Sequence, residues 1–381
     1  MSAENKQSLG EIEITRGIAI LAVLLIHITG LPLRVLEPGS ASFLFYTLIN
    51  RGMQFAVPLF LMISALVLAY GTGLGEKINW SKFYRRRWQR AVVPFLVWTT
   101  LYLALRFFII RDIPYISLKQ GLLWYGFGKG FFHLYFLSVV IQFYLLFPVI
   151  HKFWRTFKPN FITAILLFGS VQVVFYWLNK LYIYQHFSYT GSLIFSYSFP
   201  IGIGLWMGYN TGHWAAWWKK YRAFFIALAV AAGVFYINRY LASLDGVRIS
   251  TFYFQMAWAL YVSTLGICVI FLARHLAAKE GTIGSFLSGV FSKAGQYSYG
   301  SYLVHPFFLL VWQKIYAPKE SPGLDLSVWG GFLVIFGLSC VTTYLLERTF
   351  LARLLFGVPP KGINGLTGLS EIQKQNRSPR A

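Results

Sequence analysis

Residues 17–33 read GIAILAVLLIHITGLPL, an apolar run that contains a single ionisable side chain, His27. An α-helix needs roughly 20 such residues, at a rise of 1.5 Å each, to cross the hydrocarbon core of a bilayer. Similar runs recur along the chain, and we place ten spans near 17–33, 52–70, 91–110, 131–150, 161–179, 192–210, 223–241, 255–273, 297–316 and 328–346. The sequence therefore predicts an all-α, polytopic transmembrane helical bundle.

The composition agrees with a chain that lies mostly in lipid. Of the 381 residues, 57% are apolar and only 12% are charged, whereas soluble domains carry about 25% charged residues. Cys268 and Cys340 both fall inside apolar spans, so we expect neither a disulfide framework nor a metal site. We expect residues 1–360 to form one membrane-embedded domain, and the polar residues 361–381 to form a disordered cytoplasmic tail.

The net charge of +22 is compatible either with nucleic-acid binding or with the positive-inside bias of membrane proteins. If the N-terminus is inside, the cytoplasmic segments of the ten-span arrangement hold 23 of the 34 lysines and arginines. This bias predicts that both termini are cytoplasmic and that the protein lies in the cell membrane. It also explains the charge without a nucleic-acid partner.

Ionisable groups inside a span cost at least about 2.5 kcal/mol each and therefore mark function by default. Arg16 and His27 are eleven residues apart. At 100° per residue they project from the same helix face, about 16 Å apart along the axis. Glu13, three residues before Arg16, is close enough to pair with it. We place Arg16 at the cytoplasmic surface and His27 at or beyond the midplane.

Two further histidines belong to predicted spans. His305 lies halfway along span 297–316, at a depth similar to that of His27, and His133 opens span 131–150 at the outer entrance. Neutral imidazole is the usual general base near pH 7. A lone buried histidine also fits a hydrogen-bonded core residue, but a second one at the same depth favours chemistry.

An arginine and a histidine with ten residues between them in the first span resemble the signature of the acyltransferase family 3 membrane proteins. Glu13 stands where that family usually has an aspartate. Further matching positions are Phe60 to Ser64, the basic run Arg85 to Arg90 before Pro94, the His133 segment, Tyr299 to His305, and Glu347. Positions that depart from the pattern are Ala65, Tyr135 and Arg348.

The resemblance implies transfer of an acyl group, commonly acetyl, from cytoplasmic acyl-coenzyme A to a sugar hydroxyl of a surface polysaccharide or its lipid-linked precursor. The catalytic residues that it implies are His27, His305, Arg16 and Glu13. Arginine forks bind phosphate, and the residues expected to bind the donor are Arg16, Arg85, Arg86, Arg87 and Arg90. Those expected to bind the acceptor are His133, Tyr135, Ser64 and Tyr302.

Several alternatives remain open at this point. His27 fits either a base that deprotonates the acceptor hydroxyl or a carrier of the acyl group. The arginine run fits a purely topological role beside anionic lipid as well as donor binding. A transporter or flippase of a lipid-linked sugar would use the same basic and aromatic features without covalent chemistry. A structural membrane subunit with core histidines is the third interpretation.

The distribution of basic residues makes the orientation testable. Reporter fusions placed after Gly75 and after Lys361 should both give cytoplasmic signals, because both sites lie on the lysine- and arginine-rich side. Paired phosphatase and fluorescent-protein reporters measure this directly. An external signal at either site would contradict the topology and the depth assigned to His27.

Overall fold

The computed structural model describes residues 3–75, 78–113, 115–278, 281–320 and 322–360. The predicted tail at 361–381 lies outside the described residues. In the described part of the chain every regular element is a helix. The longer helices are α1 (Ala3–Ile28), α3 (Ala41–Gly52), α4 (Ala56–Thr72), α6 (Val93–Leu105), α8 (Tyr135–Phe157), α9 (Phe161–Leu178), α11 (Ser198–Tyr209), α12 (Trp214–Leu244), α13 (Thr251–Ala278), α14 (Thr282–Gln296), α15 (Ser298–Ile315) and α16 (Gly323–Leu346). The shorter ones are α2 (Pro32–Val35), α5 (Trp80–Arg87), α7 (Leu118–Phe127), α10 (Tyr184–His186) and α17 (Ala352–Phe356).

The prediction of an all-α, polytopic membrane bundle is confirmed. Among the described residues, eight helical segments are long and apolar enough to cross a membrane, and they coincide with eight of the ten predicted spans. The other two predicted spans fall on α11 and α15. Helix α11 has only 12 residues because 3-10 turns precede it, and α15 carries serine, tyrosine and histidine side chains. Which side of the membrane each terminus faces stays a prediction.

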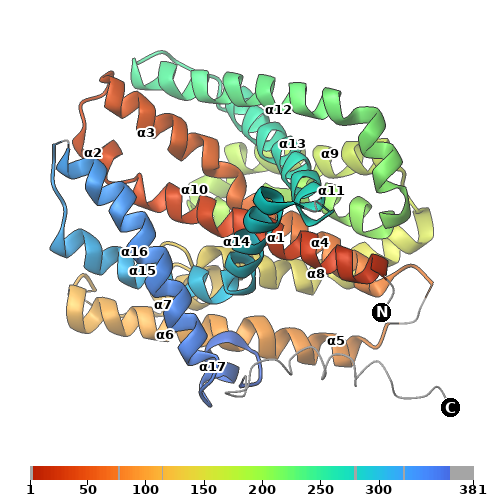
Figure 1. Ribbon diagram of the computed structural model, residues 1–381, viewed down its shortest axis with the longest axis horizontal. Helices are drawn as coiled ribbons and strands as arrows, with labels where there is room; N and C mark the ends of the chain where they lie inside the picture. The colour runs from red at the N-terminus through yellow and green to blue at the C-terminus, as the bar shows by residue number, and fades with distance from the viewer. Residues whose placement is uncertain (1–2, 76–77, 114, 279–280, 321, 361–381) are drawn as a thin grey trace.

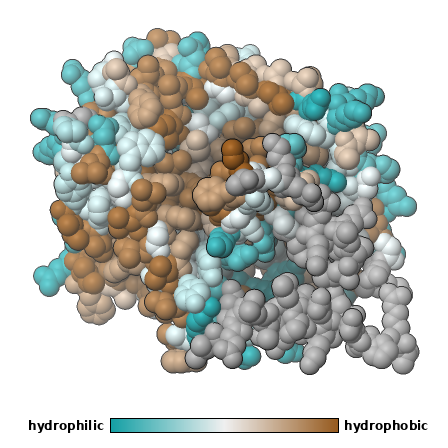
Figure 2. All heavy atoms as spheres, in the orientation of Figure 1, coloured by the Kyte–Doolittle hydropathy of each residue, from teal (hydrophilic) through white to brown (hydrophobic). Residues whose placement is uncertain are grey.

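Helix α1 lies at the centre of the bundle (Figure 1). It packs against α4, α13, α14, α15 and α16. In the same view α12 follows one edge of the molecule, and α5 and α6 follow the opposite edge. Apolar side chains cover much of the visible surface in Figure 2, as expected for a protein that faces lipid. The polar side chains of α1 and α15 are thereby kept inside the bundle.

A pair of glycines brings the backbones of α1 and α14 into direct contact. A Cβ atom on Gly17 would lie 1.9 Å from the carbonyl oxygen of Phe291, and one on Gly295 would lie 1.8 Å from the carbonyl oxygen of Glu13. The Glu13 carboxylate also accepts hydrogen bonds from Ser292 Oγ at 3.0 Å. This crossing fixes the middle of α1, where Arg16 lies.

The crossing predicts opposite effects for two glycine-to-alanine substitutions. Gly17→Ala should lower the free energy of unfolding by about 1–3 kcal/mol, because its methyl group has no space against α14. Gly337→Ala, on α16 with nothing within 4 Å of the new Cβ, should leave it unchanged or raise it, since alanine favours helix more than glycine by about 1 kcal/mol. Thermal unfolding in detergent measures both. Equal midpoints would contradict the close crossing.

Candidate functional site

Three helical segments that are distant in sequence bring three imidazole rings together. His27 comes from the last turn of α1, His305 from the middle of α15, and His133 from the turn that precedes α8. The ring centroids of His27 and His305 are 5.4 Å apart and the rings are stacked. Those of His133 and His305 are 5.7 Å apart, edge to face. We call these three residues the histidine cluster.

Hydrogen bonds from neighbouring elements hold the cluster on its α15 side. The hydroxyl of Tyr302 donates to the backbone carbonyl of His133. The hydroxyl of Tyr102, on α6, donates to the carbonyl of Leu303 at 2.7 Å, and its ring lies 5.0 Å from that of His133. These contacts tie α6, the His133 turn and α15 to one another, so the relative positions of His133 and His305 are fixed.

The end of α1 is held from the other side by Asn50 of α3. Its side-chain amide donates to the carbonyl of Ile26 at 2.8 Å and to Thr29 Oγ at 3.0 Å. The Thr29 hydroxyl donates back to the carbonyl of Leu25 at 2.5 Å. These bonds occupy backbone carbonyls at the C-terminal end of the helix, which have no partner within the helix. They fix the turn that carries His27.

The hydrogen bonding of the cluster leaves one nitrogen of His305 available. His305 Nδ1 lies 3.1 Å from the carbonyl oxygen of Ser301. A carbonyl can only accept, so Nδ1 carries the proton, and in the neutral ring Nε2 is an acceptor. That Nε2 is buried and makes no hydrogen bond to another described residue. Buried polar atoms are rarely left in this state.

A cavity of about 80 Å³ opens beside His27. Its remaining lining residues are Val23, Ile26, Gln54, Val57, Pro58, His133, Tyr135, Tyr197, Trp258 and Tyr302. A second, smaller cavity of about 10 Å³ lies between His27 and His305. His27 is half-buried, whereas His133 and His305 are buried. His27 and His133 both line the larger cavity, and His27 is the more exposed of the two.

The structure adds a contact that the sequence did not predict for His133. The sequence placed His133 at the outer entrance of its span, which stays a prediction, and the structure packs its ring against that of His305. The contact forms because α8 begins only at Tyr135 and a tight turn precedes it. Gly128 ends α7 with φ of +67°, and a Cβ there would lie 2.5 Å from the carbonyl oxygen of Leu134. This turn carries His133 into the bundle.

Arginines from two helices gather around Tyr144 of α8 at the predicted cytoplasmic end. Arg16, Arg87 and Arg90 all interact electrostatically with the Tyr144 hydroxyl, and the guanidinium of Arg87 lies 5.6 Å from the centre of the Tyr144 ring. Tyr299 of α15 donates to the carbonyl of Arg90 at 3.4 Å. We call these five residues the basic rim. Sequence reasoning missed Tyr144, since nothing distinguishes it from the other tyrosines of the spans.

The other predicted site residues lie away from these two groups or only partly join them. Arg85 and Arg86 are exposed on α5. Glu13 lies near enough to attract Arg16, but its carboxylate is hydrogen-bonded to α14. The Ser64 hydroxyl donates to the carbonyl of Phe60 at 2.8 Å. Ser64 is six residues beyond Pro58, hence about 9 Å further along α4.

Tyr135, Tyr302 and His133, three of the residues expected to bind the acceptor, line the His27 cavity; their binding role stays a prediction. The structure adds three residues that the sequence did not single out, Gln54, Tyr197 and Trp258. Gln54 lies in the turn after α3, Tyr197 in the turn before α11, and Trp258 in α13. Tertiary packing brings them together. In the described residues no group of three histidine, cysteine or acidic side chains has the geometry of a metal site.

Comparison with known proteins identifies the family of this chain. The model of the acyltransferase domain family (Acyl_transf_3) matches residues 9–348. The chain belongs to this acyltransferase family. The match spans the basic rim, the His27 cavity and the whole histidine cluster, so these features belong to the family domain. The protein is accordingly a multi-pass integral membrane acyltransferase.

Two curated relatives of this acyltransferase are both named as probable poly-beta-1,6-N-acetyl-D-glucosamine export proteins. The one from Staphylococcus aureus strain MSSA476 is 23% identical, over 91% of this chain and 94% of the relative. The one from strain MRSA252 is also 23% identical, over 86% of this chain and 89% of the relative. No solved structure matches the acyltransferase significantly.

Proposed function

We propose that this acyltransferase moves an acetyl group from cytoplasmic acyl-coenzyme A to a sugar hydroxyl of a cell-surface polysaccharide or its lipid-linked precursor, in the plasma membrane. The observation that carries the proposal is the placement of His27. It lines a cavity of mixed apolar, aromatic and polar side chains, it belongs to a cluster in which His305 Nε2 makes no hydrogen bond to another described residue, and it shares α1 with Arg16 of the basic rim.

The basic rim supports a phosphate-bearing donor. Arg16, Arg87 and Arg90 interact with the same residue, Tyr144, although Arg16 lies on a different helix from the other two. Arginines that only set the orientation of the protein in the membrane do not need to lie close to one another. Guanidinium groups bind phosphate oxygens through paired, charge-assisted hydrogen bonds. The coenzyme's phosphates would stay at this rim while its pantetheine arm follows α1 for about 16 Å of helix rise. Its thioester would then reach His27.

In the reaction itself, His27 would act as the base. Its imidazole takes the proton of the acceptor hydroxyl while the hydroxyl oxygen attacks the thioester carbonyl carbon. The carbon–sulfur bond breaks, and the coenzyme leaves as a thiolate that takes up a proton. In the alternative that the sequence left open, the imidazole nitrogen first accepts the acyl group and then passes it to the hydroxyl. His305, stacked on His27 at 5.4 Å, would support its orientation in either case.

The lining of the cavity supports a carbohydrate acceptor. Tyr135, Tyr197 and Trp258 offer aromatic faces, and Gln54 offers an amide that both donates and accepts hydrogen bonds. Aromatic rings with a polar end suit a ligand that has both apolar and polar surfaces. The names of the staphylococcal relatives, which concern a polymer of N-acetylglucosamine, point in the same direction.

The same names favour a second candidate, export of a polysaccharide without covalent chemistry. The size of the His27 cavity argues against it. About 80 Å³ has room for a few water molecules and suits an acyl group with one reacting hydroxyl better than a polymer chain. A purified protein in proteoliposomes distinguishes the two: acceptor-dependent release of coenzyme A supports transfer, and glycan movement without it supports export.

The sequence assigned donor binding to the whole basic run, whereas only some of these arginines belong to the basic rim in the structure. Arg87→Gln and Arg16→Gln should each raise the KM for acetyl-coenzyme A by roughly ten- to hundredfold, because a charge-assisted hydrogen bond contributes about 1.5–3 kcal/mol. Arg85→Gln, on the same helix as Arg87 but exposed, is the matched control and should have little effect. Steady-state kinetics with varied donor measure this. A donor KM equally unaffected in all three variants would remove donor binding from the rim.

Substitution of His27 tests the chemistry. His27→Ala should lower kcat by about 10²–10⁴-fold, the range expected for general acid–base catalysis, while binding of acetyl-coenzyme A persists. His275→Ala is a control, since His275 lies in the last turn of α13, outside the cavity lining. Acceptor-dependent coenzyme A release and donor binding by calorimetry are measured separately. Near-full activity of a folded His27→Ala protein would rule out the mechanism.

A further inference from the structure

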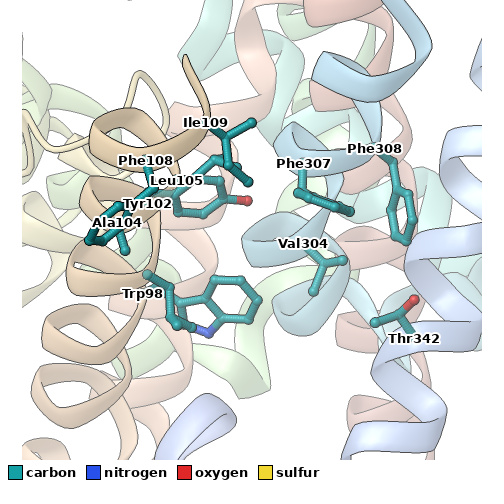
Figure 3. Close-up of a pocket in the computed structure, with 11 residues that line it drawn as sticks. Trp98, Tyr102, Ala104, Leu105, Phe108, Ile109, Val304, Phe307, Phe308 and Thr342 are labelled. Atoms are coloured by element: carbon teal, nitrogen blue, oxygen red, sulfur yellow. The ribbon is translucent and has the colours of Figure 1, made fainter. Parts of the chain in front are cut away.

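A second, larger hollow lies on the other side of Tyr102 from the histidine cluster. It has a volume of about 440 Å³ and is lined by Trp98, Leu101, Tyr102, Ala104, Leu105, Phe108, Ile109, Val304, Phe307, Phe308 and Thr342. Figure 3 shows two facing walls, one from α6 and the turn that follows it, the other from α15 with Thr342 of α16. We call this hollow the lateral groove. Nothing in the donor rim or the His27 cavity uses it.

The lateral groove lies among membrane-spanning helices and its rim is exposed. The side chains of Leu101, Phe108 and Phe307 are 47%, 69% and 41% exposed, respectively. The surroundings of these helices are hydrocarbon, not water. Closing an apolar groove there is not favoured by the hydrophobic effect, because no water is released. Five of the lining side chains are aromatic. A hollow of this kind in a membrane protein is filled by a hydrocarbon chain.

The groove and the histidine cluster are separated by one side chain. The ring of Tyr102 forms part of the groove wall and lies 5.0 Å from the ring of His133 on its other side. Its hydroxyl donates to the carbonyl of Leu303, which directly precedes the groove residue Val304 and lies two residues before His305. A chain held in the groove therefore lies next to the reacting histidines.

The outer end of the groove also adjoins the turn that carries His133. There α6 ends in a π-helical turn, Arg106–Ile110, which contributes Phe108 and Ile109 to the groove. Arg106 Nη1 donates to the carbonyl of Gly130 at 3.1 Å, three residues before His133. A polar head attached to the chain would emerge beside this turn.

We propose that the lateral groove binds the hydrocarbon tail of a lipid-linked sugar and thereby presents the sugar hydroxyl to the histidine cluster. The inference rests on the proposed function and specifies its acceptor as a membrane-anchored glycan. The donor is not the occupant, because the proposed function binds its phosphates at the basic rim and leads its arm along α1. The short acetyl group needs no apolar hollow of this size.

The test fills the groove with one side chain. Ala104→Trp places an indole in the groove, and Ala227→Trp is a matched control, since Ala227 is exposed on α12, away from the groove. Both proteins are reconstituted in nanodiscs with a sugar on polyprenyl phosphate whose tail carries a photoreactive diazirine. In the wild type and in Ala227→Trp, labelled peptides should map to α6 and α15. Ala104→Trp should reduce this labelling at least about tenfold.

Kinetics provide the second measurement. Ala104→Trp should lower kcat/KM for the lipid-linked sugar at least about tenfold and leave that for the same sugar without its tail unchanged. A diazirine phospholipid provides the labelling control. If it labels the groove as strongly as the lipid-linked sugar does, and the lipid-linked sugar does not displace it, the groove holds an adventitious lipid only and the proposal is overturned. An equal loss of kcat/KM for the sugar with and without its tail would overturn the proposal as well. If no acceptor is acetylated by the wild type, the proposed function fails, and displacement of the labelled tail still decides whether the groove binds it.

Discussion

In a bilayer, a polar side chain must find its partners inside the protein, because hydrocarbon offers none. This constraint decides the arrangement of the whole chain. Helix α1 carries His27, and α15 carries serines, tyrosines and His305; α1 lies at the centre of the bundle (Figure 1), and α15 packs its polar face against α1 and α16. The apolar helices α9 and α12, whose side chains are largely exposed, lie outside. The position of the site is a consequence of where polar groups are tolerated.

Helix α1 connects the two parts of the proposed site, and it is held by close contacts at its middle and at its last turn. Gly17 and Gly295 bring the middle of α1 against the backbone of α14, and Asn50 holds the last turn. The helix rise sets the distance from Arg16 to His27, and these contacts set where both residues lie relative to the rest of the bundle. Neither contact touches the proposed substrates, yet each sets where a catalytic side chain stands.

The sequence predicted what depends on local pattern and missed what depends on packing. Hydropathy located the spans, and helical periodicity placed Arg16 and His27 on one face. The approach of His133 to His305 depends on a left-handed glycine and a late start of α8, which no periodicity reports. The selection of Arg87 over Arg85 depends on which face of α5 meets Tyr144. That face is set by another helix, so the sequence of the basic run alone could not show it.

The hydrogen bonding of His305 favours chemistry over a structural role. A buried polar atom without a partner costs about 1–3 kcal/mol, a substantial part of the 5–15 kcal/mol by which a domain is typically stable. In the described residues His305 Nε2 makes no hydrogen bond to another protein group, and the His305 ring stacks on His27, which lines the cavity. A histidine kept only for packing is typically satisfied by a neighbour, as His151 is by the Tyr209 hydroxyl at 2.7 Å. An imidazole nitrogen that takes up a proton or a substrate hydrogen bond, in contrast, has to be free of a protein partner.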